Sequence, residues 1–310
     1  MISKFKRKTN KINSALLERK GERVALLITR GFRDLLVIGN QSRPSIFDLS
    51  VSKLDQLYET VVEVDERVTI EGFTEDPDPQ SVDLTSAVAE NQYDQHLTEG
   101  LTGEAIRIFR KPNLQRVRND LETLYHEKGY RSVAIAFMHA YTYPDHEAAV
   151  AKIARELGFK TSVSSELQPM IKIVPRAQSA TADAYLSPIV AEYLETFRDG
   201  FLGRLEDDES ARKLLLCQSD GGLTSFTRFT GLRAILSGPA SGVIGCAKTC
   251  FDKEEGTPVL GFDMGGTSTD VSRYSGSFEH VFETTVSQVA LRSPQLDVHT
   301  VAAGGGSMLF

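Results

Sequence analysis

The segment from Asp263 to Asp270 constrains the fold most, because it sets two adjacent glycines and three hydroxyl side chains between two aspartates. Apolar, strand-like runs stand on both sides of it, at 258–262 and 271–274. Gly265 and Gly266 let the backbone approach an anion closely and adopt positive φ angles without a Cβ clash. This order predicts two antiparallel strands joined by a glycine turn that is open to a ligand.

The predicted turn has the chemistry of a phosphate site. Successive backbone N–H groups in such a turn can converge on phosphate oxygens. The hydroxyls add further donors, from Thr267, Ser268 and Thr269. Asp263 and Asp270 are candidate catalytic residues and candidate Mg²⁺ ligands, since Mg²⁺ keeps several waters and uses only one or two carboxylates. A purely structural hairpin is the alternative interpretation, but the two bracketing carboxylates favour phosphate.

Two common nucleotide motifs are excluded for this segment. It lacks the Walker A pattern GxxxxGK[ST], and its turn leads into a strand, whereas both the Walker A loop and the dinucleotide fingerprint lead into a helix. A second glycine-rich stretch, 237–242 with Gly238, is predicted to be a loop before a helix at 243–250, where a helix N-terminus can bind an anion. A structural turn explains that stretch equally well.

The C-terminal residues add weaker candidates. Gly304, Gly305 and Gly306 form a third possible phosphate loop, although glycine runs are often simple turns. Asp297 and His299 have the i, i+2 spacing that places two side chains on one side of a strand, where they can chelate a metal or orient water. A surface or structural role for that pair remains the more common alternative.

The rest of the chain predicts a parallel α/β unit followed by a second domain. Buried strands are expected at 23–29, 132–138 and 161–164, and helices at 113–129 and 145–157, with Asp145 as a cap. A long helical stretch at 180–205 is expected to be interrupted, or to begin again, at Pro188. Strand, helix and strand in this order indicate parallel pairing. We expect domains at 1–205 and 206–310.

Composition excludes several classes of protein. The 310 residues carry a net charge of −7, which gives no reason to expect nucleic-acid binding. No stretch approaches the roughly 20 apolar residues that span a bilayer, so no membrane partner is expected. Three cysteines without CxxC spacing suit a reducing compartment, and we expect a cytoplasmic location.

At several of these positions the chain resembles the hydantoinase/oxoprolinase family. The hairpin segment, VLGFDMGGTSTDVSRY at 259–274, is similar to the family's signature. Other motifs follow in the family's order, over about residues 14 to 310. They are ALLERKGER at 15–23, TRGFRDL at 29–35, IGNQSRP at 38–44, SSELQPM at 164–170, VPR at 174–176, ADAYLSP at 182–188, QSDGG at 218–222, LSGPA at 236–240 and VAAGGGS at 301–307. The middle motifs resemble the eukaryotic-type 5-oxoprolinase branch.

The resemblance implies a fold and a reaction. The hairpin is similar to the phosphate hairpin of the ATPases that include actin, hexokinase and the heat-shock chaperones, so we expect that α/β, ribonuclease H-like architecture in incomplete form. The family opens the lactam of 5-oxo-L-proline to L-glutamate with ATP hydrolysis. Implied cofactors are ATP and Mg²⁺. The implied partners are the small-molecule substrate and either copies of the chain or the rest of the enzyme.

The chain also departs from the family's pattern. Family members carry another phosphate loop, of the form DRGGTFTD, upstream of the segment that corresponds to 15–23, and they continue far beyond a segment like 304–306. We therefore expect a chain truncated at both ends that alone neither hydrolyses ATP efficiently nor opens 5-oxoproline. The alternatives are a nucleotide-binding pseudoenzyme and a hydantoinase that acts on a related cyclic amide.

Overall fold

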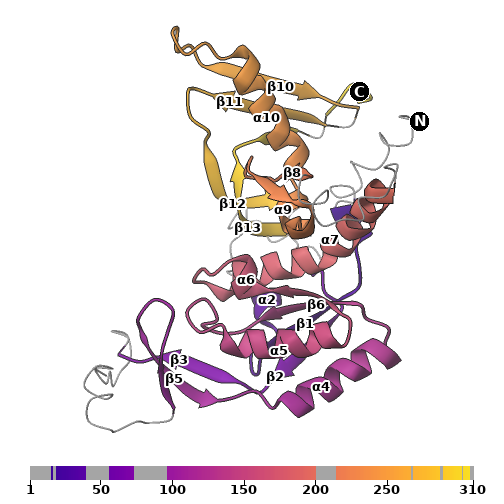
Figure 1. Cartoon of the computed structure of the whole chain (residues 1–310), viewed down its shortest axis with the longest axis vertical. Coiled ribbons are helices and arrows are strands. Elements are labelled where there is room, and N and C mark those ends of the chain that lie inside the picture. Colours follow the sequence, from indigo (N-terminus) through magenta and orange to yellow (C-terminus); the bar gives the residue numbers. More distant parts are fainter. Residues whose placement is uncertain are drawn as a thin grey trace, which may run out of the picture. The chain divides into compact units, whose positions relative to one another are not determined.

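The computed structural model describes residues 15–16, 19–39, 56–72, 96–199, 214–266, 268–286, 289–301 and 303–307 (Figure 1). The chain forms two compact units. The sheet unit comprises residues 22–185 with 288–291, and the hairpin unit comprises 1–21, 186–287 and 292–310. Each unit is described by itself. The expected domain boundary at 205/206 lies outside the described residues.

The sheet unit is built on four parallel strands in the order β2-β1-β6-β7. Their bounds are β1 Val24–Thr29, β2 Thr60–Val64, β6 Ser132–Ala136 and β7 Lys160–Val163. All residues of β1 and β6 are buried, as expected of a parallel sheet that is covered on both faces. The strand–helix–strand unit predicted from the sequence is confirmed, because β6 and β7 pair in parallel on either side of one helix in the chain.

One face of this sheet packs against two helices, α4 (Leu114–Glu122) and α5 (Asp145–Glu156). A π-helical turn, η1 (Thr123–Glu127), extends α4. The shared core contains alternate residues of the strands and the apolar stripes of both helices, among them Ala25, Leu27, Val133, Ile135, Val117, Leu121, Val150 and Ile153. Figure 1 shows both helices on the same side of β1 and β2.

The ends of these two helices agree with the ends predicted from the sequence, except for the cap of α5. Gly129 and Gly158 have φ angles of 74° and 94°, the left-handed geometry expected just past a helix end. Asp145, however, is the first residue of α5 and not its cap. The cap position is occupied by Pro144 without a side-chain hydrogen bond, and Asp145 instead favours the helix as an acidic residue in the first turn.

The long helix α7 runs without a break from Ile173 to Asp199, with Pro188 inside it. The expected interruption at Pro188 is therefore wrong. Proline removes the N–H that would bond to the carbonyl four residues earlier, which here is Ala184. Ser132 Oγ donates to that carbonyl at 2.6 Å, and the carbonyl of Tyr185 accepts from the Glu22 N–H at 3.0 Å. Ser132, the first residue of β6, thus supplies a hydrogen bond in place of the one that Pro188 removes.

Smaller elements complete the sheet unit. The short helices α2 (Leu35–Ile38) and α6 (Ser164–Leu167) follow β1 and β7. An antiparallel sheet, β3-β5-β4, has a small core of its own around Val68, Ile106 and Ile108. Its strands are β3 Arg67–Ile70, β4 Leu97–Glu99 and β5 Ala105–Arg110.

The hairpin unit contains three small sheets among its described residues. Their strand orders are β10-β11-β14, β12-β13 and β8-β9. The bounds are β8 Leu215–Cys217, β9 Leu223–Ser225, β10 Val259–Met264, β11 Thr269–Tyr274, β12 His280–Val286, β13 Val289–Leu296 and β14 His299–Val301. A 3₁₀ turn, η2 (Phe226–Arg228), and two helices, α9 (Gly231–Ala234) and α10 (Ser237–Cys250), stand between β9 and β10.

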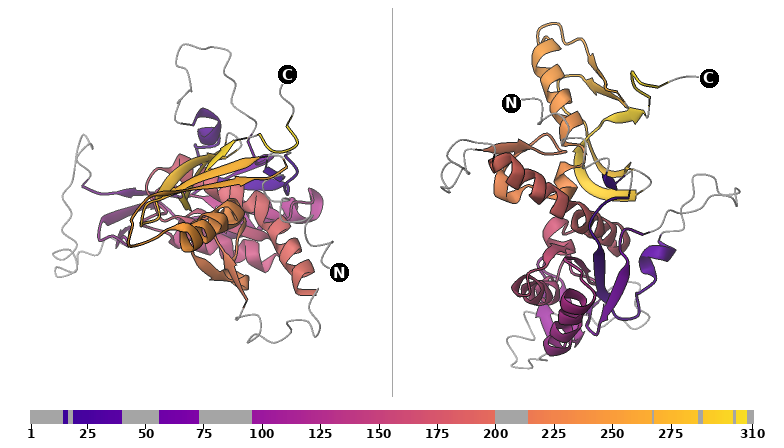
Figure 2. Two further views of the ribbon diagram at one scale, coloured as in Figure 1. Left: turned by 90° about the horizontal axis from the view of Figure 1, so that it is seen from above. Right: turned by 90° about the vertical axis from the view of Figure 1, so that its right-hand side faces the viewer.

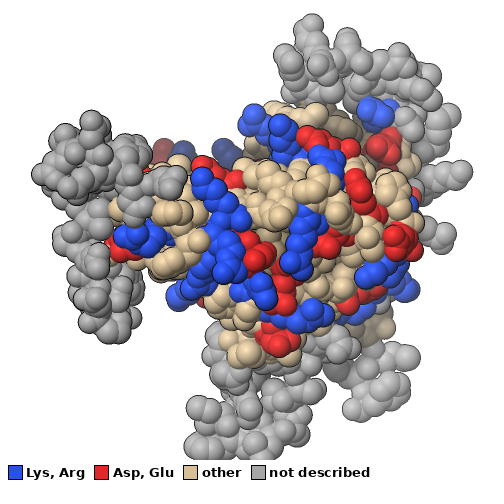
Figure 3. Space-filling view, turned by 90° about the horizontal axis from the view of Figure 1, so that it is seen from below, with Lys and Arg blue, Asp and Glu red and all other residues tan. Residues whose placement is uncertain are grey.

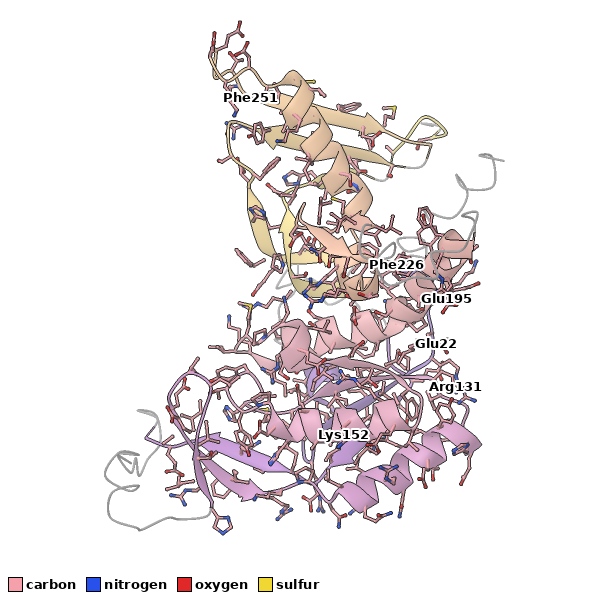
Figure 4. The ribbon with its side chains drawn as sticks, in the orientation of Figure 1. Glu22, Arg131, Lys152, Glu195, Phe226 and Phe251 are labelled. Carbon is pink, nitrogen blue, oxygen red and sulfur yellow. The ribbon has the colours of Figure 1, made fainter. Side chains whose placement is uncertain are left out.

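Helix α10 begins earlier than predicted. The stretch 237–242 was expected to be a glycine-rich loop, yet it forms the first turns of α10. Pro239 suits the start of a helix because its missing N–H would have had no partner there. Ala240 and Val243 of α10 are buried and pack against Leu296. Figure 4 labels Phe251, where α10 ends, and Figure 2 shows α10 lying across β10 and β11.

The surface charges of one face and the apolar length of the helices can be described from the structure. On the face drawn in Figure 3, Lys and Arg side chains alternate with Asp and Glu and form no field of one sign. Among the described residues, no helix is both long enough and apolar enough to cross a membrane.

Candidate phosphate-binding site

The predicted hairpin forms, with β10 and β11 paired from Val259↔Tyr274 to Met264↔Thr269. Asp263 and Asp270 are direct cross-strand partners in this register, so their side chains leave the same face of the hairpin. The Gly265 N–H donates to the Ser268 carbonyl at 2.8 Å and closes the turn. Thr267 lies outside the described residues.

The third glycine loop lies against this turn. The Gly305 N–H donates to the Gly265 carbonyl at 2.9 Å, and the Gly306 N–H donates to the Gly266 carbonyl at 3.0 Å. Gly304 begins a tight turn closed by the Ser307 N–H, which donates to its carbonyl at 2.9 Å. The loop that looked weakest in sequence is therefore a brace for the hairpin, and its glycines contact the turn through backbone atoms.

Strand β14 and the loop that follows it bring Thr300 and Ala303 to the hairpin. It pairs antiparallel with β11, with Thr300 opposite Asp270 and Val301 opposite Thr269. Thr300 Oγ1 donates to Asp270 Oδ1 at 2.6 Å, and Thr269 Oγ1 donates to the Ala303 carbonyl at 2.6 Å. The Thr300 bond holds the Asp270 side chain in place. The Asp263 side chain, by contrast, is exposed and forms no hydrogen bond or ion pair with another described residue.

The turn offers donors to an anion. Within the described part of the chain, the N–H groups of Gly266 and Ser268 have no acceptor. A Cβ at Gly266 would meet no atom within 4 Å, so the backbone there is open to a ligand. Two unused N–H donors, an open glycine and two carboxylates on one face fit the phosphates and the metal ion of a nucleotide.

Helix α10 supports the hairpin from one face. Gly261 of β10 lies against it, since a Cβ there would stand 3.5 Å from Cys246 Sγ and 2.6 Å from Ser272 Oγ. A side chain at this position would make an ordinary contact with the helix and would force the hydroxyl of its cross-strand partner, Ser272, to move. Partial burial raises the pKa of the Cys246 thiol, and the neighbouring Cys250 adds to the rise, so this thiol stays protonated beside the strand.

No hydrogen bond joins Gly238 to the hairpin turn among the described residues. It lies in the first turn of α10, and a Cβ there would meet nothing within 4 Å. The nearby Ser237 hydroxyl donates to the Ala234 carbonyl at 2.9 Å, so the bonds of this turn point to α9. Its role in anion binding stays a prediction.

Asp297 and His299 also remain apart from the two hairpin aspartates. His299 is the partner of Val271, and neighbouring residues of a strand face opposite sides, so its side chain leaves the face opposite to Asp270 and Thr300. The His299 Nε2 and Asp297 Oδ1 atoms are 3.8 Å apart, and the histidine is 81% exposed. No cluster of three or more His, Cys, Asp or Glu side chains suited to a metal occurs in the described residues.

Thr300 and Ala303 are the site residues that sequence reasoning missed. Their only signal was a position next to the glycines at 304–306. Recognising Thr300 required the register of β14, because a shift by one residue would have placed His299 beside Asp270 instead.

Comparison with known families decides the wider assignment. The model described as hydantoinase/oxoprolinase N-terminal region matches residues 8–158, and the model described as hydantoinase/oxoprolinase matches residues 176–310. The chain belongs to the hydantoinase/oxoprolinase family. The resemblance seen in the sequence motifs is confirmed.

Curated relatives in this family are much longer than the chain. It is 51% identical over 303 residues to 5-oxoprolinase of Saccharomyces cerevisiae, a match that covers 97% of this chain and 23% of that protein. It is 48% identical over 302 residues to 5-oxoprolinase 1 of Arabidopsis thaliana, covering 97% and 22%. The chain therefore spans less than a quarter of the length of these relatives.

Solved structures show the same fold. Acetone carboxylase in a nucleotide-free structure aligns with a TM-score of 0.68 and 20% identity over 94% of this chain and 38% of that chain. The ATP-dependent caprolactamase of Pseudomonas jessenii aligns with a TM-score of 0.67 and 22% identity over 95% and 38%. The mixed α/β structure with its parallel sheet confirms the expected fold class and is consistent with an actin-like ATPase fold.

Proposed function

We propose that the hairpin unit supplies a nucleotide phosphate site to an ATP-dependent enzyme that opens 5-oxo-L-proline to L-glutamate. One observation carries the proposal: the turn at Gly265 and Gly266 is braced by Gly305 and Gly306 on one side, while its unused N–H groups and two aspartates remain available to a ligand. Bound ATP would supply the phosphoryl group that turns an unreactive amide oxygen into a leaving group.

The chain's own residues have distinct tasks in this proposal. The Gly266 and Ser268 N–H groups hold phosphate oxygens. Asp263 and Asp270 hold Mg²⁺ together with water, since this ion takes few protein ligands. Thr300 keeps the Asp270 carboxylate in place by its 2.6 Å hydrogen bond. Catalysis then rests mainly on positioning and charge neutralisation.

The choice of substrate is supported by the relatives. Two relatives that are 51% and 48% identical over nearly the whole chain are named as 5-oxoprolinases, and a structural neighbour is a caprolactamase. Both names refer to a cyclic amide. A hydantoinase reaction would use the same phosphate hairpin on a related ring, so the substrate assay must include hydantoin. Mg²⁺ as the metal, and association with further chains, stay predictions.

A chimera tests the proposal without requiring the chain to act alone. Residues 8–307 would replace the aligned segment of the Saccharomyces cerevisiae relative, and ATP-dependent glutamate formation from 5-oxo-L-proline would be measured. We expect the chimera to form glutamate and to release phosphate with it. Asp263→Asn in the chimera should lower the rate at least about a hundredfold, the scale of a lost charge-positioning group in catalysis.

Two results would overturn the proposal. A folded chimera that hydrolyses hydantoin but not 5-oxo-L-proline would assign the sister activity. An Asp263→Asn chimera as fast as its parent would remove the hairpin from the reaction. Asp252→Asn, a charge change in the exposed loop between α10 and β10, is the matched control and should leave the rate unchanged.

A further inference from the structure

The carboxyl edge of the parallel sheet in the sheet unit is a place where ligands commonly bind. From β1 the chain continues to β2 on one side and later returns to β6 on the other, so the strand order reverses between β1 and β6. Ligands of open α/β sheets bind outside the carboxyl ends of the strands at such a point. Glu22 and Arg131, labelled in Figure 4, precede β1 and β6 and mark the opposite, amino edge.

A buried carboxylate joins the loops at this reversal. Glu66, just after β2, is 2% exposed and accepts a hydrogen bond from Thr29 Oγ1 at the end of β1. Thr29 Oγ1 accepts from the Met138 N–H at 3.0 Å, just after β6. The second oxygen of Glu66 lies 2.8 Å from His146 Nδ1, whose ring is also buried. The ends of three strands are therefore tied together by side chains.

A second buried carboxylate fixes the neighbouring loop. Glu147 is fully buried and accepts from the Phe137 N–H at 2.7 Å and from the Ser165 N–H at 2.9 Å. Ser164 Oγ donates to it at 2.6 Å, and the buried Arg176 donates to Ser164 Oγ and to the Phe137 carbonyl. Burying two carboxylates, a histidine and an arginine costs free energy that an apolar core would avoid, and it produces a rigid edge.

Above this rigid edge stands a group of partly exposed side chains. Arg67 begins β3 and places its guanidinium 5.1 Å from the ring centre of Phe32, and it forms no ion pair with another described residue. His139 follows β6 with a φ angle of 55°, a strained left-handed geometry that folded proteins retain mainly at functional sites. The Tyr141 ring lies 6.4 Å from the His139 ring, measured between centroids.

Electrostatics at this group favour an anion. Burial lowers the pKa of His139, and the nearby guanidinium groups of Arg67 and Arg176 lower it further, while Glu66 opposes them. His139 therefore favours its neutral form. The two guanidinium groups lie close enough to act on it, as does the carboxylate of Glu66, and the Glu104 carboxylate acts on the neighbouring Tyr141. The Arg176 guanidinium donates hydrogen bonds to Ser164, Met170 and Phe137. The Arg67 guanidinium, by contrast, forms no ion pair with a described carboxylate.

We propose that Arg67 and His139 hold the carboxylate of a small cyclic amide at this edge of the sheet. The proposal rests on the function proposed above and names the residues that select its substrate class. A guanidinium binds a carboxylate through two parallel N–H donors, and a neutral imidazole donates a third hydrogen bond. Arg67 directly follows Glu66 and His139 directly follows Met138, and both Glu66 and Met138 are hydrogen-bonded to Thr29 at the strand reversal. A cyclic amide without a carboxylate would leave Arg67 unpaired.

Two ligands that differ only in the carboxylate test this. 5-Oxo-L-proline and 2-pyrrolidinone share the lactam ring, and their affinities would be measured by calorimetry with the whole chain and with Arg67→Met. We expect the parent chain to bind 5-oxo-L-proline at least about tenfold more tightly than 2-pyrrolidinone, and Arg67→Met to abolish that preference. Arg110→Met is the matched control, because Arg110 is the cross-strand partner of Arg67 and pairs with Asp65.

Each other outcome decides against the proposal. A preference that survives Arg67→Met, or a parent chain that binds neither ligand, would overturn it. Inorganic phosphate that displaces 5-oxo-L-proline more strongly than acetate would assign Arg67 and His139 to a phosphate instead. Failure here is distinct from failure of the proposed reaction: in the active chimera, Arg67→Met should raise the KM for 5-oxo-L-proline and leave the KM for ATP unchanged.

Discussion

The backbone N–H of Gly305 donates a hydrogen bond to the carbonyl of Gly265 at 2.9 Å, which joins two glycine-rich segments that are far apart in the sequence. This bond and its neighbour from Gly306 to Gly266 hold the hairpin turn from one side. The turn therefore keeps one conformation before a ligand arrives. A preorganised backbone loses less entropy on binding.

The brace predicts different effects for two adjacent glycines. A Cβ at Gly306 would stand 3.0 Å from the Gly266 carbonyl oxygen, so the loop or the turn would have to move. A Cβ at Gly305 would stand 3.7 Å from the Gly265 carbonyl oxygen, an ordinary contact. Gly306→Ala should weaken binding of Mg²⁺-ATP at least about tenfold, or about 1.4 kcal/mol, and Gly305→Ala should weaken it much less. Calorimetry on both variants measures the difference, and equal effects would contradict the brace.

The hydrogen bond from Ser132 to Ala184 predicts a coupled pair of substitutions. Ser132→Ala leaves a buried carbonyl without a donor and should cost about 1–3 kcal/mol of unfolding free energy. Pro188→Ala restores the N–H that belongs to that carbonyl in a regular helix. The cost of Ser132→Ala should therefore be smaller in the Pro188→Ala background. Urea unfolding of the four proteins gives the coupling, and purely additive free energies would show that the bond does not compensate the proline.

The sequence predicted more about elements than about their contacts. The hairpin at 263–270, the parallel strands β6 and β7 and the glycine helix ends were all readable from local residue order. The interruption predicted at Pro188 was wrong, because the hydrogen bond that proline removes is replaced by one from Ser132, a residue of strand β6. The contacts of Gly305 and Thr300 with the hairpin depend on the register between β11 and β14, and local periodicity does not determine that register. The Arg67 and His139 pair was missed for the same reason, since Arg67 begins β3 and His139 follows β6.

The buried carboxylate at the sheet edge predicts a large loss of stability. Glu147→Gln keeps the shape but turns an amide N–H₂ toward backbone N–H donors and removes the charge facing Arg176. We expect a loss of about 1–3 kcal/mol, as for a buried donor left without an acceptor, because the side chain no longer accepts from both the Phe137 and the Ser165 N–H groups. Glu156→Gln on the same helix, where the exposed carboxylate pairs with Arg118 at 2.6 Å, should cost less than about 1 kcal/mol. Similar losses in both would contradict the structural role of Glu147.

The environment of His139 predicts a pH dependence of stability. Its pKa is lowered below the usual 6.5 by burial and by Arg67 and Arg176, against Glu66, with Tyr141 beside it. The folded chain therefore binds fewer protons than the unfolded chain. This contribution is fully present above pH 6.5 and is lost as the pH falls through the folded pKa. His139→Asn tolerates the left-handed backbone and should unfold with a shallower pH slope below pH 6.5. Identical slopes would contradict the assignment.

The central claim is that the hairpin at Gly265 and Gly266 binds nucleotide phosphate, and calorimetric titration of Mg²⁺-ATP into the whole chain tests it most directly. Asp263→Asn and Asp252→Asn would be titrated beside the parent, because both remove one negative charge and only Asp263 faces Asp270 across the hairpin. We expect binding in the parent and in Asp252→Asn, and none in Asp263→Asn. Equal binding by all three proteins, or no binding by the parent, would contradict the claim.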